Sequence, residues 1–149
     1  MDKETGTEEI HPALITNDKM PPFPIGDLLG FRLIEIREGI SRVAFTAEAR
    51  HANPMGTLHG GVLADVTDAA MGMVVISTLK EGESFTTLEM KINFLRPFRT
   101  GGLIAEGKVI NRGQTIVLVE AEVLDEKNRL IARATSTCMI LKGEMARGR

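Results

Sequence analysis

Hydrophobic and polar residues alternate along most of the chain after Phe31, in stretches separated by turn-forming residues. The first two stretches, 31–36 and 40–49, are joined through Glu38-Gly39, as in a β-hairpin. Four more stretches follow, at 87–95, 103–110, 115–124 and 130–141. The short segments between the last three are rich in turn formers. We therefore predict six strands in an antiparallel sheet.

The stretch 87–95 shows the alternation most clearly. One face carries Leu88, Met90, Ile92 and Phe94, and the other carries Thr87, Glu89, Lys91 and Asn93. This is the period of a half-buried strand. The pattern thus predicts that Thr87 lies on the polar face.

The segment 59–76 breaks the alternation and is the longest apolar stretch of the chain. Its residues are apolar or small on nearly every side of a helix, and a helix of that kind must be buried all round. The antiparallel sheet therefore has to curl around it. The expected fold is an α+β hotdog fold, a curled sheet wrapped around one long central helix.

The 149 residues are the size of a single domain. We expect a hotdog domain at 25–142, which opens with a short helix over Ile25–Leu29 that Gly30 stops. Residues 1–24 contain Pro21-Pro22-Phe23-Pro24 and are interpreted as a tail or strap. Residues 143–149 are interpreted as a C-terminal tail.

Composition excludes several function classes. A formal net charge of −2 without a Lys/Arg block gives no attraction to nucleic acid. The N-terminus is acidic, unlike a secretory signal, and the apolar run 69–76 is too short to span a bilayer, so a cytoplasmic protein without membrane contact is expected. Cys138 is the one cysteine and falls in an alternating strand, where an inert buried thiol is expected.

The apolar helix nevertheless carries two carboxylates. An ionised carboxylate in an apolar core costs several kcal/mol unless it is paired or hydrogen-bonded. Asp65 and Asp68 lie three residues apart and share one helix face, so that face meets either solvent or a functional site. Asp65 is the better candidate for a solvated position. The helix begins at His59-Gly60-Gly61, and a glycine start leaves backbone N–H groups and a positive dipole end free for a developing oxyanion.

The stretch 53–61, Asn-Pro-Met-Gly-Thr-Leu-His-Gly-Gly, followed by Asp68, resembles the signature of the hotdog-fold acyl-CoA thioesterases of the phenylacetyl-CoA thioesterase (PaaI) type. The likeness covers roughly residues 28–141. It implies that Asp68 is the general base or nucleophile and that the Gly60 N–H polarises the thioester carbonyl. It also implies that Asn53 and His59 position the attacking water and the start of the helix.

The same resemblance suggests further residues of the site. A Ser or Thr early in the next strand often joins the site, and the best match is Thr87, with Thr86 as its neighbouring alternative. The candidates for substrate binding are Gly61 and three arginines that could meet the CoA phosphates, Arg96, Arg99 and Arg112. The acyl pocket would be lined by Ala69, Met71, Met73 and Phe94. No metal is expected, because the three histidines are spread along the chain, and no cofactor is expected beyond the CoA of the substrate.

The spacing of Gly60 and Asp68 predicts a dimer. Eight residues of helix separate the two by about 12 Å along the axis, too far for both to reach one carbonyl group. Two such helices running antiparallel about a two-fold axis would bring Gly60 of one subunit to Asp68 of the other. We therefore expect an obligate homodimer with shared sites, and the resemblance implies that dimers pair into tetramers.

Two other functions remain open at this stage. A hydroxyacyl dehydratase or hydratase shares the fold, but the dehydratase pattern would place an acid where this chain has Met73, and the Asp-to-His signature of hydratases is absent. A non-catalytic acyl-CoA sensor would use the same pocket. The segment before Gly30 is too short for a helix-turn-helix module, so such a sensor would act through protein contacts.

Overall fold

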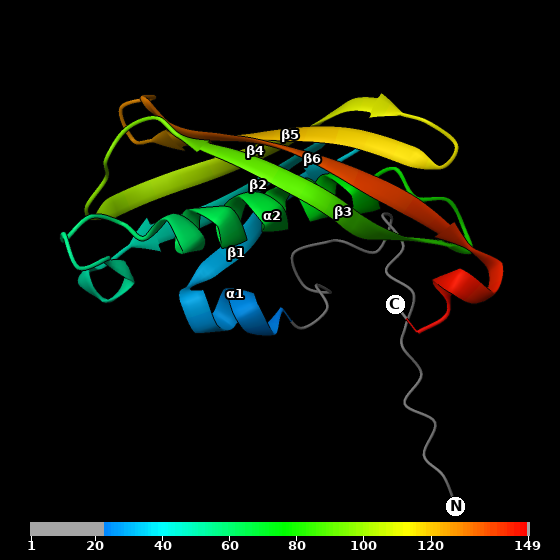
Figure 1. The fold of residues 1–149 in the computed structure, drawn as a ribbon, viewed down its shortest axis with the longest axis horizontal. Coiled ribbons are helices and arrows are strands. Elements are labelled where there is room, and N and C mark those ends of the chain that lie inside the picture. The colour runs from blue at the N-terminus through cyan, green and yellow to red at the C-terminus, as the bar shows by residue number, and fades with distance from the viewer. Residues whose placement is uncertain (1–22, 149) are drawn as a thin grey trace, which may run out of the picture.

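The computed structural model describes residues 23–148, which form one antiparallel sheet and one long helix. The elements are α1 (Pro24–Leu29), β1 (Phe31–Arg37), β2 (Ile40–Ala47), η2 (Ala49–His51), α2 (Gly60–Ile76), β3 (Glu83–Phe94), β4 (Gly101–Arg112), β5 (Ile116–Asp125), β6 (Leu130–Lys142) and η3 (Gly143–Ala146). The six strands lie in the order β1-β2-β4-β5-β6-β3, and the sheet arches over α2 (Figure 1). This architecture confirms the predicted hotdog fold.

The core lies between the inner face of the sheet and α2. Alternate residues of each strand point to this face, as the period of a strand requires. Fully buried examples are Val117, Val119, Ala121 and Val123 of β5, which pack with Val66, Ala70, Val74 and Val75 of α2 in the same core. The apolar positions that the alternation marked are therefore the ones that hold the helix in place.

The helix approaches the sheet closely at Ala70. The buried Ser41 hydroxyl on β2 donates a 2.6 Å hydrogen bond to the Ala70 carbonyl oxygen. A Cβ atom built on Gly107 of β4 would lie 2.6 Å from both that carbonyl oxygen and the Ser41 hydroxyl. Only glycine therefore lets the backbone of α2 come this near to β4.

Replacing Gly107 with alanine is expected to destabilise the fold by about 2–3 kcal/mol, because the methyl group forces α2 away from β4 and breaks the Ser41 hydrogen bond. The control is Gly102→Ala on the same strand, where a Cβ atom would meet only the exposed side chain of Glu126, at 3.1 Å, and that side chain can move aside. Chemical denaturation measures both, and Gly102→Ala should cost less than about 1 kcal/mol, since nothing in the core has to shift. Equal stability of the two variants would contradict this account.

The helix is not buried on every side. Gly61, Asp65 and Asp68 are exposed and Gly72 is half-buried, and these four follow one another at helical spacing along one side of α2. We call them the exposed stripe. The expectation of a helix buried all round within one chain was therefore wrong, because the sheet covers the opposite side of α2 and leaves the stripe uncovered.

Strand β3 contains a β-bulge that the alternation did not reveal. Its pairing with β6 shifts register between Thr87 and Glu89. Thr87 pairs with the buried Cys138 and so lies on the inner face, while Glu89 pairs with Thr137 on the outer face. The prediction that Thr87 shares a face with Glu89 was wrong, because the extra residue at the bulge reverses the alternation.

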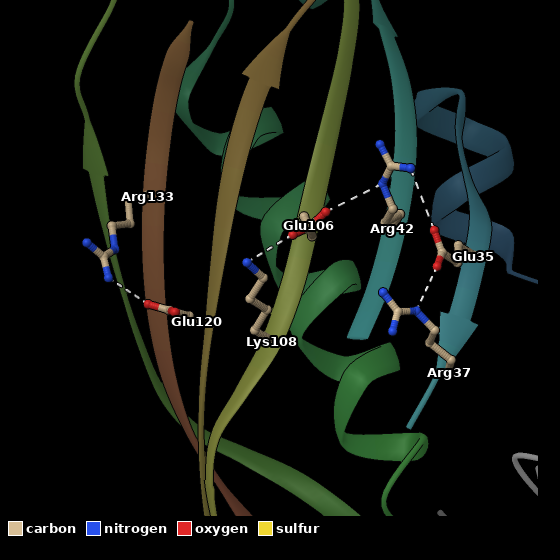
Figure 2. Close-up of polar contacts among 7 residues, drawn as sticks. All are labelled: Glu35, Arg37, Arg42, Glu106, Lys108, Glu120 and Arg133. Atoms are coloured by element: carbon tan, nitrogen blue, oxygen red, sulfur yellow. Dashed lines mark hydrogen bonds and ion pairs between the residues drawn. The ribbon is translucent and has the colours of Figure 1, made fainter. Parts of the chain in front are cut away.

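The outer face of the sheet carries a chain of ion pairs across β1, β2 and β4, with α2 behind the sheet (Figure 2). Glu35 contacts Arg37 at 2.9 Å and Arg42 at 3.6 Å, and Arg42 contacts Glu106 at 3.6 Å. Exposed pairs of this kind contribute at most about 1 kcal/mol each. We interpret these ion pairs as part of a solvated surface.

Short helices lie at both ends of the described part of the chain. Helix α1 ends at Leu29 with Gly30 as its left-handed cap, as predicted. Strand β6 ends at Lys142, and the segment after it, predicted as a tail, forms the short helix η3. The predicted N-terminal tail lies outside the described residues except for its last two. No helix within 23–148 has the length and apolar character needed to cross a membrane.

Candidate active site

The start of α2 leaves one backbone N–H free. His59 is the N-cap residue in extended conformation, and its Nδ1 accepts a 2.8 Å hydrogen bond from the Gly61 N–H. The His59 carbonyl oxygen accepts from Val62 and Leu63 at 3.0 and 3.3 Å. Within 23–148 no acceptor is recorded for the Gly60 N–H. Gly60 therefore presents a donor to any ligand at the helix start, whereas the Gly61 N–H is already occupied.

An aromatic ring packs against the Cα of Gly60. A Cβ atom on Gly60 would come within 2.9 Å of Cζ of Phe94, the last residue of β3. Glycine thus allows the ring to sit against the backbone. The side chain of Phe94 remains 56% exposed, so the ring walls the helix start without closing it.

The loop 53–57 before the helix is held by its own hydrogen bonds. Asn53 Oδ1 accepts from the N–H groups of Met55 at 2.9 Å and Thr57 at 3.2 Å, and Asn53 Nδ2 donates to Thr57 Oγ1 at 2.8 Å. Arg99 Nη1 donates to the Gly56 carbonyl oxygen at 3.1 Å. In this structure Asn53 and Arg99 therefore shape the loop beside the helix start.

A cavity of about 440 Å³ lies at this end of α2. Its lining residues are Asn53, Thr57, Leu58, Gly60, Leu63, Phe94, Leu95, Arg96, Pro97 and Phe98. The walls are mostly apolar, and Gly60 and Arg96 stand among them. The cavity thus combines a free backbone donor, a cation and an apolar lining, which suits a ligand with a carbonyl group and an apolar chain.

A second cluster forms further along α2, around Asp68. Thr87 Oγ1 lies 3.8 Å from the sulfur of Cys138, and Cys138 is buried as predicted. Burial raises the pKa of the Cys138 thiol, and the nearby charge of Asp68 raises it further. Hydrogen bonds with Ser136 and Thr87 lower this pKa but do not cancel the rise. Such a thiol stays protonated and unreactive near neutral pH. The structure thus brings Thr87, rather than its neighbour Thr86 on the outer face, to the side of the sheet that carries Asp68.

The Asp68 carboxyl is perturbed in the way expected of a functional acid. Its side chain reaches solvent, yet enough protein surrounds it that burial raises its pKa, and the charge of Asp65 adds to this rise. Neither carboxylate makes an ion pair within residues 23–148. A carboxylate that is poorly solvated and lacks a cation is more basic than an ordinary aspartate.

The two clusters do not meet within one chain. The cavity at Gly60 does not include Asp68 or Thr87 in its lining. Asp68 comes eight residues after Gly60 on α2, about 12 Å along the axis. Each chain therefore carries two halves of a possible site, a donor half at the cavity and a carboxylate half on the exposed stripe.

The predicted substrate-binding arginines have different roles in the structure. Arg96 lines the cavity, and Arg99 holds the loop. Arg112 instead pairs with Glu83 at 2.7 Å, at the first residue of β3, while the cavity lies at the last residue of that strand. A strand of this length spans about 35 Å, so within one chain Arg112 is a structural side chain far from the cavity. Two members of the predicted acyl pocket, Ala69 and Met71, are core residues.

Sequence reasoning missed part of the cavity wall. Leu58, Pro97 and Phe98 were not predicted to lie at the site, yet the Leu58 N–H donates to the Phe98 carbonyl oxygen at 2.7 Å and joins two loops distant in sequence. One sequence signal could have indicated this wall. The mostly apolar run 94–98 continues past the point where Pro97 must end the strand. No three His, Cys, Asp or Glu side chains in 23–148 are grouped so as to hold a metal ion.

The family model of the thioesterase superfamily matches residues 55–132, just over half of the chain. The chain belongs to the thioesterase superfamily. The match begins in the loop before α2 and includes the whole of the helix, so both halves of the candidate site lie within it, apart from Asn53. The predicted family is thus confirmed, and with it the assignment as a thioester hydrolase.

Individual members of the superfamily resemble the whole domain. The medium/long-chain acyl-CoA thioesterase YigI of Escherichia coli is 26% identical over 132 residues, which cover 78% of this chain and 85% of that protein. The PaaI protein of the E. coli phenylacetic acid degradation operon superposes with a TM-score of 0.74 at 25% identity, over 80% of this chain and 85% of that one. A thioesterase of Haemophilus influenzae superposes with a TM-score of 0.75 at 25% identity, over 79% of this chain and 82% of that one.

Proposed function

We propose that this thioesterase hydrolyses acyl-CoA thioesters at two equivalent sites, each shared between the subunits of a homodimer. The observation that carries the proposal is the division of the site on α2. The free Gly60 N–H lies in the cavity wall, and Asp68 lies about 12 Å away on the exposed stripe of the same helix. An oxyanion donor and a base must both lie near one carbonyl group, so each half needs its complement from a second chain.

The uncovered surfaces fit such a dimer. An antiparallel pair of α2 helices about a two-fold axis places Gly60 of each opposite Asp68 of the other and fills the exposed stripe. The glycines at both ends of the stripe, Gly61 and Gly72, allow the helices to approach closely. Strand β3 lies at an edge of the sheet beside the half-site with Thr87, and an edge strand of twelve residues offers unpaired backbone groups to a second copy.

The chemistry needs only these two groups and water. The Gly60 N–H donates to the thioester oxygen and stabilises the negative charge that develops there. In one route Asp68 takes a proton from water as the water oxygen bonds to the carbonyl carbon; in the other its carboxylate attacks the carbon and forms an anhydride, which water then hydrolyses. In both routes the carbon–sulfur bond breaks, the thiolate of CoA takes up a proton, and a carboxylic acid is formed.

The cavity supports an acyl-CoA as the substrate. Its apolar wall, which includes Leu58, Leu63 and Phe94, suits the apolar part of a thioester. Arg96 is exposed and is the arginine of the cavity lining, so it is the cation placed to meet a CoA phosphate. The name of the YigI relative, a medium/long-chain acyl-CoA thioesterase, is in line with this substrate class.

Free-thiol release from short, medium, long and aromatic acyl-CoAs tests the activity, and a purified mixed dimer tests the sharing. One subunit carries Asp68→Asn and the other carries Gly60→Pro, which removes the N–H. In a shared arrangement one site of the mixed dimer is intact and the other has both defects, so it should show roughly half the wild-type rate per dimer. Each homodimeric variant is the control and should be nearly inactive.

Two outcomes would contradict the proposal. If each site used Gly60 and Asp68 of a single chain, both sites of the mixed dimer would be defective and no activity would return. If the wild type bound acyl-CoA stoichiometrically but released no thiol, the protein would be an acyl-CoA-binding sensor.

A further inference from the structure

Asp65 has no function in the mechanism described so far, although it stands on the exposed stripe beside Asp68. The two carboxylates are three residues apart on α2, which places their Cβ atoms about 5–6 Å from each other. Both are exposed within the single chain, and neither has a cationic partner among the residues that the structure describes. A like-charged pair at this spacing weakens a helix slightly, so its presence in the middle of α2 needs an explanation.

Six other acidic residues in the described part of the chain pair with a cation: Glu35, Glu48, Glu83, Glu106, Glu120 and Asp125. The hydrogen bond from Arg37 lowers the pKa of Glu35, with Arg42 as a further cation nearby. Asp68 has no such neighbour: from the sheet it faces Thr87 and the buried, protonated Cys138, and from its own helix it faces Asp65. Glu89 of β3, the remaining acid near this cluster, points to the outer face. Asp65 is therefore the charge on α2 that acts most directly on Asp68.

We propose that Asp65 is a positioning residue that acts through Asp68: its negative charge, one helical turn away and without a cation, strengthens Asp68 as the base or nucleophile of thioester hydrolysis. The inference rests on the proposed role of Asp68. Burial is the largest cause of the raised pKa of Asp68, and the charge of Asp65 is the second. A more basic carboxylate removes a proton or attacks a carbonyl more readily, provided that it is still ionised at the working pH.

Removing the charge of Asp65 should raise the relative activity at low pH and lower it at high pH. In Asp65→Asn the acid limb of the kcat/KM profile should move to lower pH by about half a unit or more, because Asp68 no longer has to ionise beside a second negative charge. The variant should therefore be relatively more active than the wild type on the acid side. It should be about two- to threefold less active at pH 8, where Asp68 is ionised in both proteins but less basic in the variant.

Two further variants separate this effect from a structural one. Asp65→Glu keeps the charge and should keep the acid limb of the wild type. Glu81→Gln removes one negative charge from the turn after α2 and should leave the limb unchanged. An unshifted limb in Asp65→Asn, or an equal loss of rate at every pH, would overturn the inference.

The inference and the proposed function fail in different ways. Asp68→Asn with wild-type activity would remove the proposed role of Asp68 and this inference together. If Asp68→Asn is inactive but the acid limb of the kcat/KM profile does not shift in Asp65→Asn, the inference is overturned and the proposed function stands.

Discussion

Replacing Gly60 with proline is expected to lower kcat by about 100- to 1000-fold, the usual loss when one oxyanion donor is removed. Gly60 is the first residue of α2, the position at which proline fits a helix best. His59 before it has φ −63° and ψ 132°, a conformation that a residue preceding proline favours. The backbone thus accepts the ring, and the chief chemical change is the loss of the N–H that we propose as the oxyanion donor. Steady-state thiol release measures the loss.

The matched control for this variant is Gly60→Ala. Its methyl group meets Phe94 much as the proline ring does, at 2.9 Å before any adjustment, but the N–H remains. The exposed Phe94 ring can move aside, so we expect a loss of less than about tenfold, and the contrast between the two variants isolates the hydrogen bond. Similar activity in both would show that the N–H of Gly60 takes no part in catalysis and that the ring contact matters instead.

Replacing Asp68 with asparagine is expected to lower kcat by at least about a hundredfold on the best acyl-CoA, because the side chain keeps its shape but loses the ability to accept a proton or to attack. Circular dichroism and the oligomeric state, measured alongside, should match those of the wild type. A variant with wild-type activity would place the chemistry on another residue, with Asp65 the first to examine.

The same variant should be at least as stable as the wild type. The pKa of Asp68 is raised in the folded protein, so the folded protein binds a proton at this carboxyl more tightly than the unfolded chain does. The favourable contribution is therefore fully present below the unfolded pKa and is lost as pH rises through the folded pKa. At neutral pH the wild type therefore holds an ionised carboxylate in a poorly solvated place, and asparagine removes this cost. Thermal unfolding of the variant should occur at the same temperature as that of the wild type or at a higher one. A lower unfolding temperature at pH 7 would indicate that Asp68 is a structural residue.

Most of the fold follows from local patterns. Strands β4, β5 and β6 lie within a few residues of their predicted limits because each buries alternate residues on one face, and that period is visible in the sequence. Strand β3 shows the limit of such reasoning. Its bulge at Leu88 depends on how the strand pairs with β6, so the face on which Thr87 lies was assigned wrongly.

Some features of the candidate site are also visible in the sequence, and others are not. The spacing of Gly60 and Asp68 can be counted in the sequence, and the proposal of a second chain at each site follows from it. The cavity wall could not be found in this way, since Leu58 and Phe98 meet only through a contact between distant loops. Arg112, predicted as a partner for CoA, is paired with Glu83 across the sheet, a contact that no local pattern indicates.

The sequence by itself determined the six strands, the apolar helix with its two aspartates, and the glycine start beside His59. These features depend on periodicity and on the conformations open to single residues, which act over a few positions. Only the tertiary structure decided which side of α2 stays uncovered, that Thr87 turns inward, and which residues wall the cavity beside Gly60. Those facts depend on contacts between residues far apart in the chain, where packing and strand pairing override local preference.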